Sequence, residues 1–135
     1  MKEKKPIVLD AWAVMAYLQG EPAAKNVADI ISDALEQGVP VGMCVVNVGE
    51  VWYTVARRRS ASDAQEVLRL LREIGIKMVD ADFALTGIAA GFKVRGGISY
   101  ADCFAAALAK QKGGTLVTGD PEFKQLENEI AIEWL

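Results

Sequence analysis

The sequence predicts an α/β protein in which helices cover both faces of a parallel β-sheet. Short apolar runs alternate with longer segments of helical periodicity along the whole chain, and this alternation is typical of βαβ units. The 135 residues fit one domain, which usually spans about 100–200 residues, and no repeat or linker interrupts them. The composition, 52% apolar and 24% charged, is that of an ordinary globular protein.

In the first half of the sequence, turn and cap residues separate the expected elements. A short apolar run that ends in an acid is typical of a buried strand, and Gly20 ends the helix that follows it. Pro22 and Gly38 mark the start and end of a second helix, whose apolar residues recur at helical spacing. A β-rich run then precedes a helix that begins at Asn47. The expected elements are a strand over 5–10, helices over 11–18 and 22–37, a strand over 39–46 and a helix over 47–59.

The second half of the sequence continues the same alternation. Ser62 with Gln65 indicates a capping box at the start of a helix that Gly75 ends. Ser99 with Asp102 resembles another capping box, ahead of an alanine-rich helix. The expected elements are a helix over 62–74, a strand over 76–79, helices over 83–94 and 100–112, and strands over 115–118 and 130–134.

The chain contains no histidine, which narrows its possible chemistry. Catalysis by a Ser-His-Asp or Cys-His arrangement, a histidine general base and histidine-bound zinc are all excluded. Because there are also just two cysteines, any metal must be held by oxygen ligands. Oxygen ligands favour magnesium or manganese.

The cysteines and the N-terminal region indicate a reducing, cytoplasmic location without a membrane anchor. Cys44 and Cys103 both lie in apolar stretches, which suggests reduced thiols. The apolar run over 7–18 contains Asp10 and is too short to span a bilayer. The net charge of −3 does not indicate a general nucleic-acid binder, so any polyanion contact must be local.

Four acids are placed to meet at one edge of the predicted sheet. Asp10 ends the first strand, Glu50 lies one turn into the helix after the second, and Asp120 follows the fourth. Asp102 opens the helix that leads into that fourth strand. In open α/β sheets, ligands bind beyond the carboxyl ends of the strands. Each acid alone also fits a structural role, as a helix cap, a helix-start partner or an Asx turn.

The combination of these acids favours a metal site. Four carboxylates at one end of a sheet repel one another unless a positive charge lies among them, and no lysine or arginine is adjacent to any of the four. A divalent cation supplies that charge, because hard cations bind carboxylate oxygens. On a phosphodiester, such a site lowers the pKa of a bound water and neutralises charge that develops on the phosphate.

Four motifs in order carry a resemblance to a known family. They are IVLDAWAV at 7–14, VVNVGEVWY at 45–53, ISYADCFAAALA at 98–109 and LVTGDPEF at 116–123. With these motifs the chain resembles PIN-domain ribonucleases, and in particular the VapC toxins of toxin–antitoxin pairs. The resemblance implies a single PIN domain over 1–135, a three-layer α/β/α fold with about five parallel strands in the order 3-2-1-4-5. It also implies that Mg²⁺ or Mn²⁺ is coordinated by Asp10, Glu50, Asp102 and Asp120, with the Thr118 hydroxyl contacting a metal-bound water or phosphate.

By the same resemblance, the chain is expected to be the toxin of a type II toxin–antitoxin system. Its activity would be that of a metal-dependent endoribonuclease that hydrolyses RNA with an activated water. Its expected partners are RNA, a VapB-like antitoxin and a second copy of itself in a homodimer. The implied strand order places Asp80 and Asp82 at the sheet edge, outside the site, and Glu122 is interpreted as a solvated turn acid.

Basic and aromatic residues indicate where partners bind. Local positive charge for RNA contact is found in Arg57, Arg58 and Arg59, about two helical turns beyond Glu50. Trp12, Tyr17 and Tyr53 have apolar neighbours and fit packing better than base stacking. The expected walls of an antitoxin groove are the helices over 22–37 and 47–59, with Trp12, Tyr17 and Trp52.

Other functional classes remain as alternatives. A PIN fold that binds a partner without nuclease activity is one of them. A receiver-like signalling domain is another: Asp80 offers its central aspartate, but the early pair of acids is missing. A haloacid-dehalogenase-like phosphotransfer site requires a second acid at the position of Trp12. A dinucleotide-binding module requires a G-x-G-x-x-G motif after the first strand, and the sequence lacks it.

Overall fold

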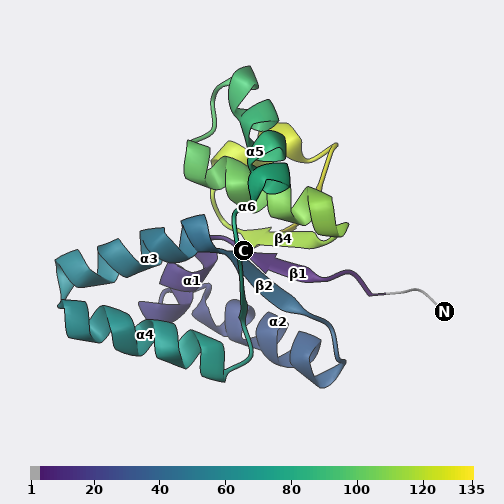
Figure 1. The fold of residues 1–135 in the computed structure, drawn as a ribbon. Helices are drawn as coiled ribbons and strands as arrows, with labels where there is room; N and C mark the ends of the chain where they lie inside the picture. The colour runs from purple at the N-terminus through teal and green to yellow at the C-terminus, as the bar shows by residue number, and fades with distance from the viewer. Residues whose placement is uncertain (1–3) are drawn as a thin grey trace.

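A computed structural model describes residues 4–135 and shows a five-stranded parallel sheet with helices on both faces (Figure 1). The strands are β1 (Ile7–Leu9), β2 (Val41–Cys44), β3 (Lys77–Val79), β4 (Thr115–Thr118) and β5 (Ala131–Trp134). The helices are α1 (Ala11–Leu18), α2 (Ala24–Glu36), α3 (Val45–Arg58), α4 (Ala61–Glu73), α5 (Phe83–Arg95) and α6 (Tyr100–Lys112), with a 3-10 helix η1 (Pro121–Leu126). The predicted α/β class is confirmed.

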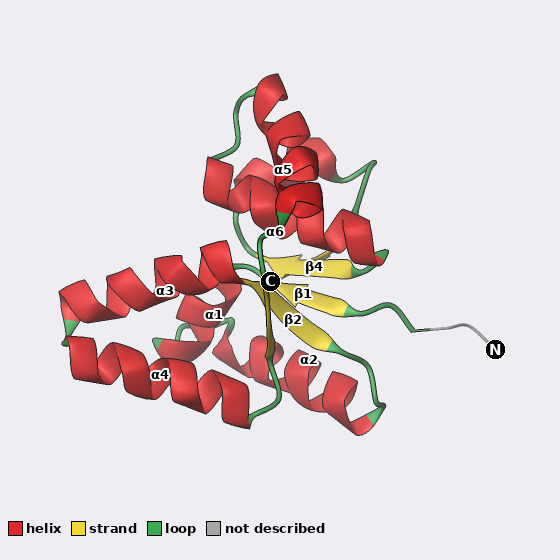
Figure 2. Ribbon diagram, viewed as in Figure 1, coloured by secondary structure: helices red, strands yellow, loops and turns green. Residues whose placement is uncertain are grey.

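The sheet has the order β3-β2-β1-β4-β5 with every pair parallel, so β1 lies in its centre (Figure 2). This is the order that the resemblance implies. It differs from the order 2-1-3-4-5 of receiver domains, and the receiver-like alternative is therefore wrong. Asp80 and Asp82 follow the edge strand β3, as predicted. Asp82 is the N-cap of α5, where its Oδ1 accepts a hydrogen bond of 2.9 Å from the Leu85 N–H.

Successive residues of the central strands face opposite helical layers, as the two-residue period of a strand requires. Val8 and Leu116 belong to a core shared with α5, α6 and η1. Leu9 and Val117 belong to a second core shared with α1, α2, α3 and α4. The central strands are therefore buried on both faces of the sheet. The region where a ligand can bind lies beyond the carboxyl ends of the strands.

Three helices begin at residues other than those predicted. Helix α2 starts at Ala24 and not at residue 22. Helix α3 starts at Val45, because the ladder between β2 and β3 ends at the pair Cys44–Val79. The two valines that follow therefore lack a strand partner on that side, and their β propensity gives way to this context. The predicted helix start at Asn47 is wrong. Helix α4 is capped by Ser60, whose Oγ accepts a hydrogen bond of 3.0 Å from the Asp63 N–H, so the predicted capping box at Ser62 is also wrong.

Buried polar groups draw attention to one edge of the sheet. Within residues 4–135 the buried polar side chains are Asp10, Asn47 and Thr118, each 0% exposed. A buried polar group lowers stability unless it is hydrogen-bonded. Three such groups are therefore expected to take part in a polar site with hydrogen-bonding partners. The described residues include no helix with both the length and the apolar character needed to cross a bilayer.

Candidate active site

Asp10 lies where the central strand β1 passes into α1, and its two oxygens have different partners. Its Oδ1 accepts a hydrogen bond of 2.8 Å from the Ala13 N–H and caps α1. Its Oδ2 accepts a hydrogen bond from the Thr118 hydroxyl. The capping role considered for Asp10 is confirmed, and the same residue also belongs to the polar site.

Thr118 connects Asp10 to the next acid. It is the last residue of β4, which pairs with β1. Its Oγ1 donates to Asp10 and accepts a hydrogen bond of 3.0 Å from the Asp120 N–H. Asp120 in turn caps η1, with its Oδ1 accepting a hydrogen bond of 2.9 Å from the Glu122 N–H. The carboxyl ends of the two central strands are thus connected by one chain of hydrogen bonds.

Asn47 joins the third acid, Glu50, to the start of α6. Its Nδ2 donates to Glu50 Oε1 over 3.1 Å and to the carbonyl oxygen of Ala101 over 3.0 Å. Its Oδ1 is buried and has no hydrogen-bond partner in the described structure. This role of Asn47 was not predicted from the sequence. Its position in the sequence could have indicated this role. Asn47 lies three residues before Glu50, and on α3 it shares a buried face with Val48 and Val51.

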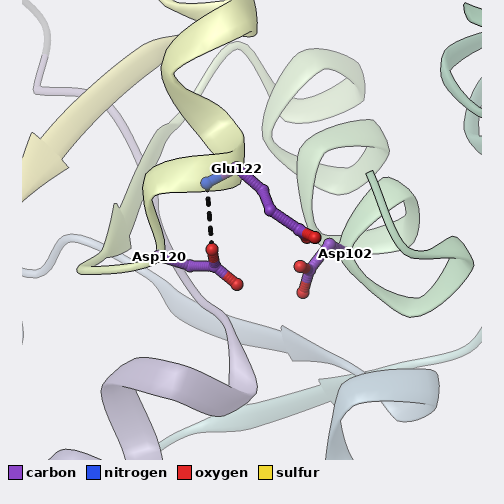
Figure 3. Close-up of side chains that lie close together, drawn as sticks. All are labelled: Asp102, Asp120 and Glu122. Atoms are coloured by element: carbon purple, nitrogen blue, oxygen red, sulfur yellow. Dashed lines mark hydrogen bonds between the residues drawn. The ribbon is translucent and has the colours of Figure 1, made fainter. Parts of the chain in front are cut away.

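Asp102 lies in the first turn of α6 and faces η1. Its N–H donates a 3.2 Å hydrogen bond to the Ser99 Oγ, so Ser99 caps α6 as predicted. One carboxylate oxygen from each of Asp102, Asp120 and Glu122 lies within 4.8 Å of the other two, and the three side chains point toward one another (Figure 3). Glu122 is exposed, as expected of a turn acid, yet it also takes part in this group.

We call Asp10, Glu50, Asp102, Asp120 and Glu122 the acidic cluster. The pKa of Asp10 is raised to about 7, chiefly by burial and also by the charges of Asp120 and Glu50, although the hydrogen bonds from Thr118 and Ala13 lower it. Burial first, then a hydrogen bond with Glu122 and the charges of Asp120 and Asp10, raise the pKa of Asp102 to about 8. The pKa of Glu50 is raised by burial and by Asp120, while its hydrogen bond from Asn47 lowers it. The carboxylates therefore share one electrostatic environment.

The acidic cluster has no cationic partner among residues 4–135. The ion pairs there lie elsewhere on the surface: Lys25–Asp29, Arg69–Glu66, Arg69–Glu73 and Arg95–Glu129. A set of carboxylates with a threonine hydroxyl offers oxygen ligands alone. This donor set fits a hard divalent cation, whose charge would offset both the burial of the carboxylates and the repulsion between them.

The Trp12 ring packs against Gly119, the residue between Thr118 and Asp120. A Cβ atom built on Gly119 would lie 2.3 to 2.6 Å from three carbons of the Trp12 indole ring. The ring therefore lies directly on the backbone between Thr118 and Asp120. Trp12 is 36% exposed, so it forms part of the rim beside the acidic cluster.

The predicted RNA-contact arginines lie at the other end of α3 from the acids. Arg57, Arg58 and Arg59 are exposed, and the Arg57 guanidinium lies 5.2 Å from the centre of the Tyr53 ring. Arg58 and Arg59 also line a cavity of about 370 Å³ between α1, α3 and α4, together with Met15, Leu18, Gln19, Val55 and Val67. The hollow beside these arginines is thus bounded by α1, α3 and α4.

The comparisons with known proteins agree with this arrangement. The sequence matches the family described as PIN domain over residues 7–129, and a search of curated proteins finds no match. One similar solved structure is VapBC2 from Rickettsia felis bound to a DNA fragment from its promoter. Its TM-score is 0.73 and its identity 16%, over 96% of this chain and 98% of that chain.

Two other similar structures come from different bacteria. VapC20 from Mycobacterium tuberculosis, a sarcin-ricin loop cleaving toxin, has a TM-score of 0.69 and 17% identity, over 93% of this chain and 96% of that chain. FitAcB from Neisseria gonorrhoeae has a TM-score of 0.69 and 24% identity, over 93% of this chain and 95% of that chain. With the family match over nearly its whole length, the chain belongs to the PIN-domain family, and its fold is that of the VapC toxins.

Proposed function

We propose that the protein is a metal-dependent endoribonuclease and the toxin of a type II toxin–antitoxin system. The observation that carries this proposal is the acidic cluster, which lies at the carboxyl ends of the central strands without a cationic partner in residues 4–135. Asp10, Glu50, Asp102 and Asp120 would hold Mg²⁺ or Mn²⁺. The PIN-domain match and the solved VapBC structures support the same function.

The residues of the chain prepare the site for hydrolysis of an RNA phosphodiester. The bound ion would lower the pKa of a bound water and would neutralise charge that develops on the phosphate. Thr118 is fixed between Asp10 and the Asp120 N–H, and its hydroxyl retains one acceptor position for a water. Water would attack phosphorus as the bond to the 3′-oxygen breaks, so that one product carries a 5′-phosphate and the other a 3′-hydroxyl, and the proton lost by the water balances the proton that the 3′-oxygen gains.

The proposed partners are RNA and a VapB-like antitoxin. One structural neighbour is a toxin that cleaves the sarcin-ricin loop, and others are toxin–antitoxin complexes. For RNA contact we propose Arg57, Arg58 and Arg59, which are exposed on α3, the helix that also carries Glu50. Their charges would offset the repulsion between the acidic protein and a polyanion.

The test is cleavage of RNA by variants that keep the shape of each acid. Asp10→Asn and Asp102→Asn should each lower the cleavage rate at least about 100-fold, equivalent to about 2.7 kcal/mol of transition-state stabilisation. Asp33→Asn, which changes an exposed acid on α2, is the matched control and should cleave like the wild type. Circular dichroism checks that each variant is folded.

Removal of metal tests the second part of the proposal. Cleavage should stop in EDTA and return when Mg²⁺ or Mn²⁺ is added in excess. Full cleavage by Asp102→Asn, or cleavage that survives EDTA, would contradict the proposal. A wild-type protein that binds RNA with Mg²⁺ but never cuts it would instead support a binding module without nuclease activity.

A further inference from the structure

Three members of the acidic cluster come from two segments outside the sheet. Asp102 lies in the first turn of α6, which follows the loop over residues 96–99. Asp120 and Glu122 lie at the start of η1. One carboxylate oxygen from each lies within 4.8 Å of the other two (Figure 3), and like charges at this range repel one another. Contacts that hold the loop against η1 therefore oppose this repulsion.

The loop over 96–99 has little conformational restriction of its own. Gly96 and Gly97 have φ angles of 76° and 80°, in the left-handed region that glycine enters without steric cost. Glycine also loses more backbone freedom on folding than any other residue. The loop therefore depends on its neighbours for a fixed shape, and with it the position at which α6 begins.

Gln125 connects this loop to η1. Its Nε2 donates to the carbonyl oxygen of Gly97 over 3.3 Å and to that of Glu122 over 3.2 Å. An amide NH2 group has two donors, so one side chain satisfies both carbonyls. A Cβ atom built on Gly97 would lie 3.1 Å from the same nitrogen. Glycine at this position thus permits both the backbone angle and the close approach of Gln125.

The last turn of α5 fixes the loop from its other side. The Lys93 Nζ donates to the carbonyl oxygen of Ile98 over 2.9 Å. Arg95 forms an ion pair with Glu129, which follows η1, and its Nη2 donates over 2.7 Å. The end of α5, the loop and the η1 segment are therefore connected by directional polar contacts.

We propose that Gln125 is a positioning residue for the acidic cluster. By bonding a backbone carbonyl on each segment, it holds Asp102 near Asp120 and Glu122 before a cation binds. An apolar core shared by α5, α6 and η1 also holds these elements together, but apolar burial is non-directional, whereas hydrogen bonds depend on geometry. The inference rests on the proposed function, because the ligand is the divalent cation of the nuclease site.

The first experiment titrates the full chain with Mn²⁺ in a calorimeter, without RNA. Gln125→Met keeps the length of the side chain and removes its two donors. We expect its dissociation constant for Mn²⁺ to rise about 2- to 10-fold, which corresponds to the usual net contribution of a hydrogen bond. Gln111→Met is the matched control, because Gln111 is exposed near the other end of α6. It should bind Mn²⁺ with wild-type affinity.

A second control separates positioning from a general loss of stability. Ser60→Ala removes the hydrogen bond that caps α4, and loss of such a cap destabilises a protein. Its urea midpoint should fall at least as far as that of Gln125→Met, while its affinity for Mn²⁺ stays that of the wild type. A purely structural role of Gln125 would not give this difference between the two variants.

The metal dependence of RNA cleavage gives an independent readout. For Gln125→Met, the Mg²⁺ concentration at half-maximal rate should rise about 2- to 10-fold. The rate at saturating Mg²⁺ should remain that of the wild type, because excess ion fills the weakened site. Ser60→Ala should change neither quantity.

Two outcomes would overturn this inference alone, while the wild type still binds Mn²⁺ and cuts RNA. They are wild-type affinity for Mn²⁺ in Gln125→Met, and an equal loss of affinity in Ser60→Ala. A wild type that binds no Mn²⁺ would contradict the metal site of the proposed function, and this inference with it. The two failures are therefore distinguishable.

Discussion

Individual residues in the site combine structural and chemical roles. Asp10 uses one oxygen to cap α1 and the other to accept from Thr118. Asp120 caps η1 through one oxygen, while an oxygen of its carboxylate lies within 4.8 Å of oxygens from Asp102 and Glu122. A capping role and a site role are therefore compatible in one carboxylate, because a carboxylate has two oxygens with several acceptor positions.

The clearest residue-scale prediction concerns Asn47. Asn47→Ala removes the two hydrogen bonds that tie Glu50 and the Ala101 carbonyl together. We expect the free energy of unfolding to fall by about 1–3 kcal/mol, because a buried acceptor loses its donor. Affinity for Mn²⁺ should fall as well, since Glu50 is no longer held in place. Urea unfolding and calorimetric Mn²⁺ titration measure the two effects.

The control for Asn47 is Asn128→Ala, which alters an exposed asparagine outside any helix or strand. It should change neither stability nor Mn²⁺ affinity by a measurable amount. If Asn47→Ala unfolds more easily but binds Mn²⁺ with wild-type affinity, Asn47 supports the fold and does not position the acids.

At the scale of elements, the site depends on how the turn after β4 packs on α1. The Trp12 ring occupies the space beside Gly119. We expect Gly119→Ala to force the ring away and to lower the free energy of unfolding by about 1–3 kcal/mol, the usual cost of overpacking. Denaturant titration gives this value, and intrinsic tryptophan fluorescence reports the displaced ring.

Gly49→Ala is the matched control for this turn. Gly49 lies inside α3, and a Cβ atom there would meet nothing within 4 Å. Alanine in a helix interior is favoured over glycine by about 0.5–1 kcal/mol, so this variant should be slightly more stable than the wild type. Equal effects of the two substitutions would mean that contact with Trp12 does not limit position 119.

Hydrophobic periodicity, together with the glycine, proline and cap residues between elements, was sufficient to predict the succession of strands and helices along the chain. Each element has its own apolar face and its own end signals. Element ends were less predictable. Val45 and Val46 have the local preference of a strand, yet they lie in α3 because the ladder of β2 with β3 stops at Cys44. That limit is set by a segment more than thirty residues later in the chain.

The candidate site was predictable in part for the same reason. Asp10 and Asp120 each lie just beyond the carboxyl end of a predicted strand, where ligands bind in open α/β sheets. This position was sufficient to predict both as site residues. Asn47 and Glu122 gave no comparable signal. Their participation depends on how α3 and η1 approach α6, which is a property of the packed structure and not of the local sequence.

At the scale of the whole molecule, burial of the acidic cluster makes stability depend on pH. The pKa of Asp10 rises from 3.8 to about 7 and that of Asp102 from 3.8 to about 8 in the folded chain. A raised folded pKa means that folding favours the protonated form. The stability from these two groups is thus fully present below about pH 3.8 and is lost as the pH rises through 7 to 8.

We therefore expect the metal-free protein to unfold more easily at about pH 8 than at about pH 6. Asp10→Asn removes one titrating group and keeps an oxygen that can accept from the Ala13 N–H, so its stability should vary less over this range. Excess Mg²⁺ should raise the melting temperature more at the higher pH, because cation binding no longer has to displace protons. Melting curves in EDTA and in Mg²⁺ measure both effects. A metal-free wild type that gains stability from pH 6 to pH 8, with Asp10→Asn showing the same gain, would contradict the raised pKa values of these buried acids.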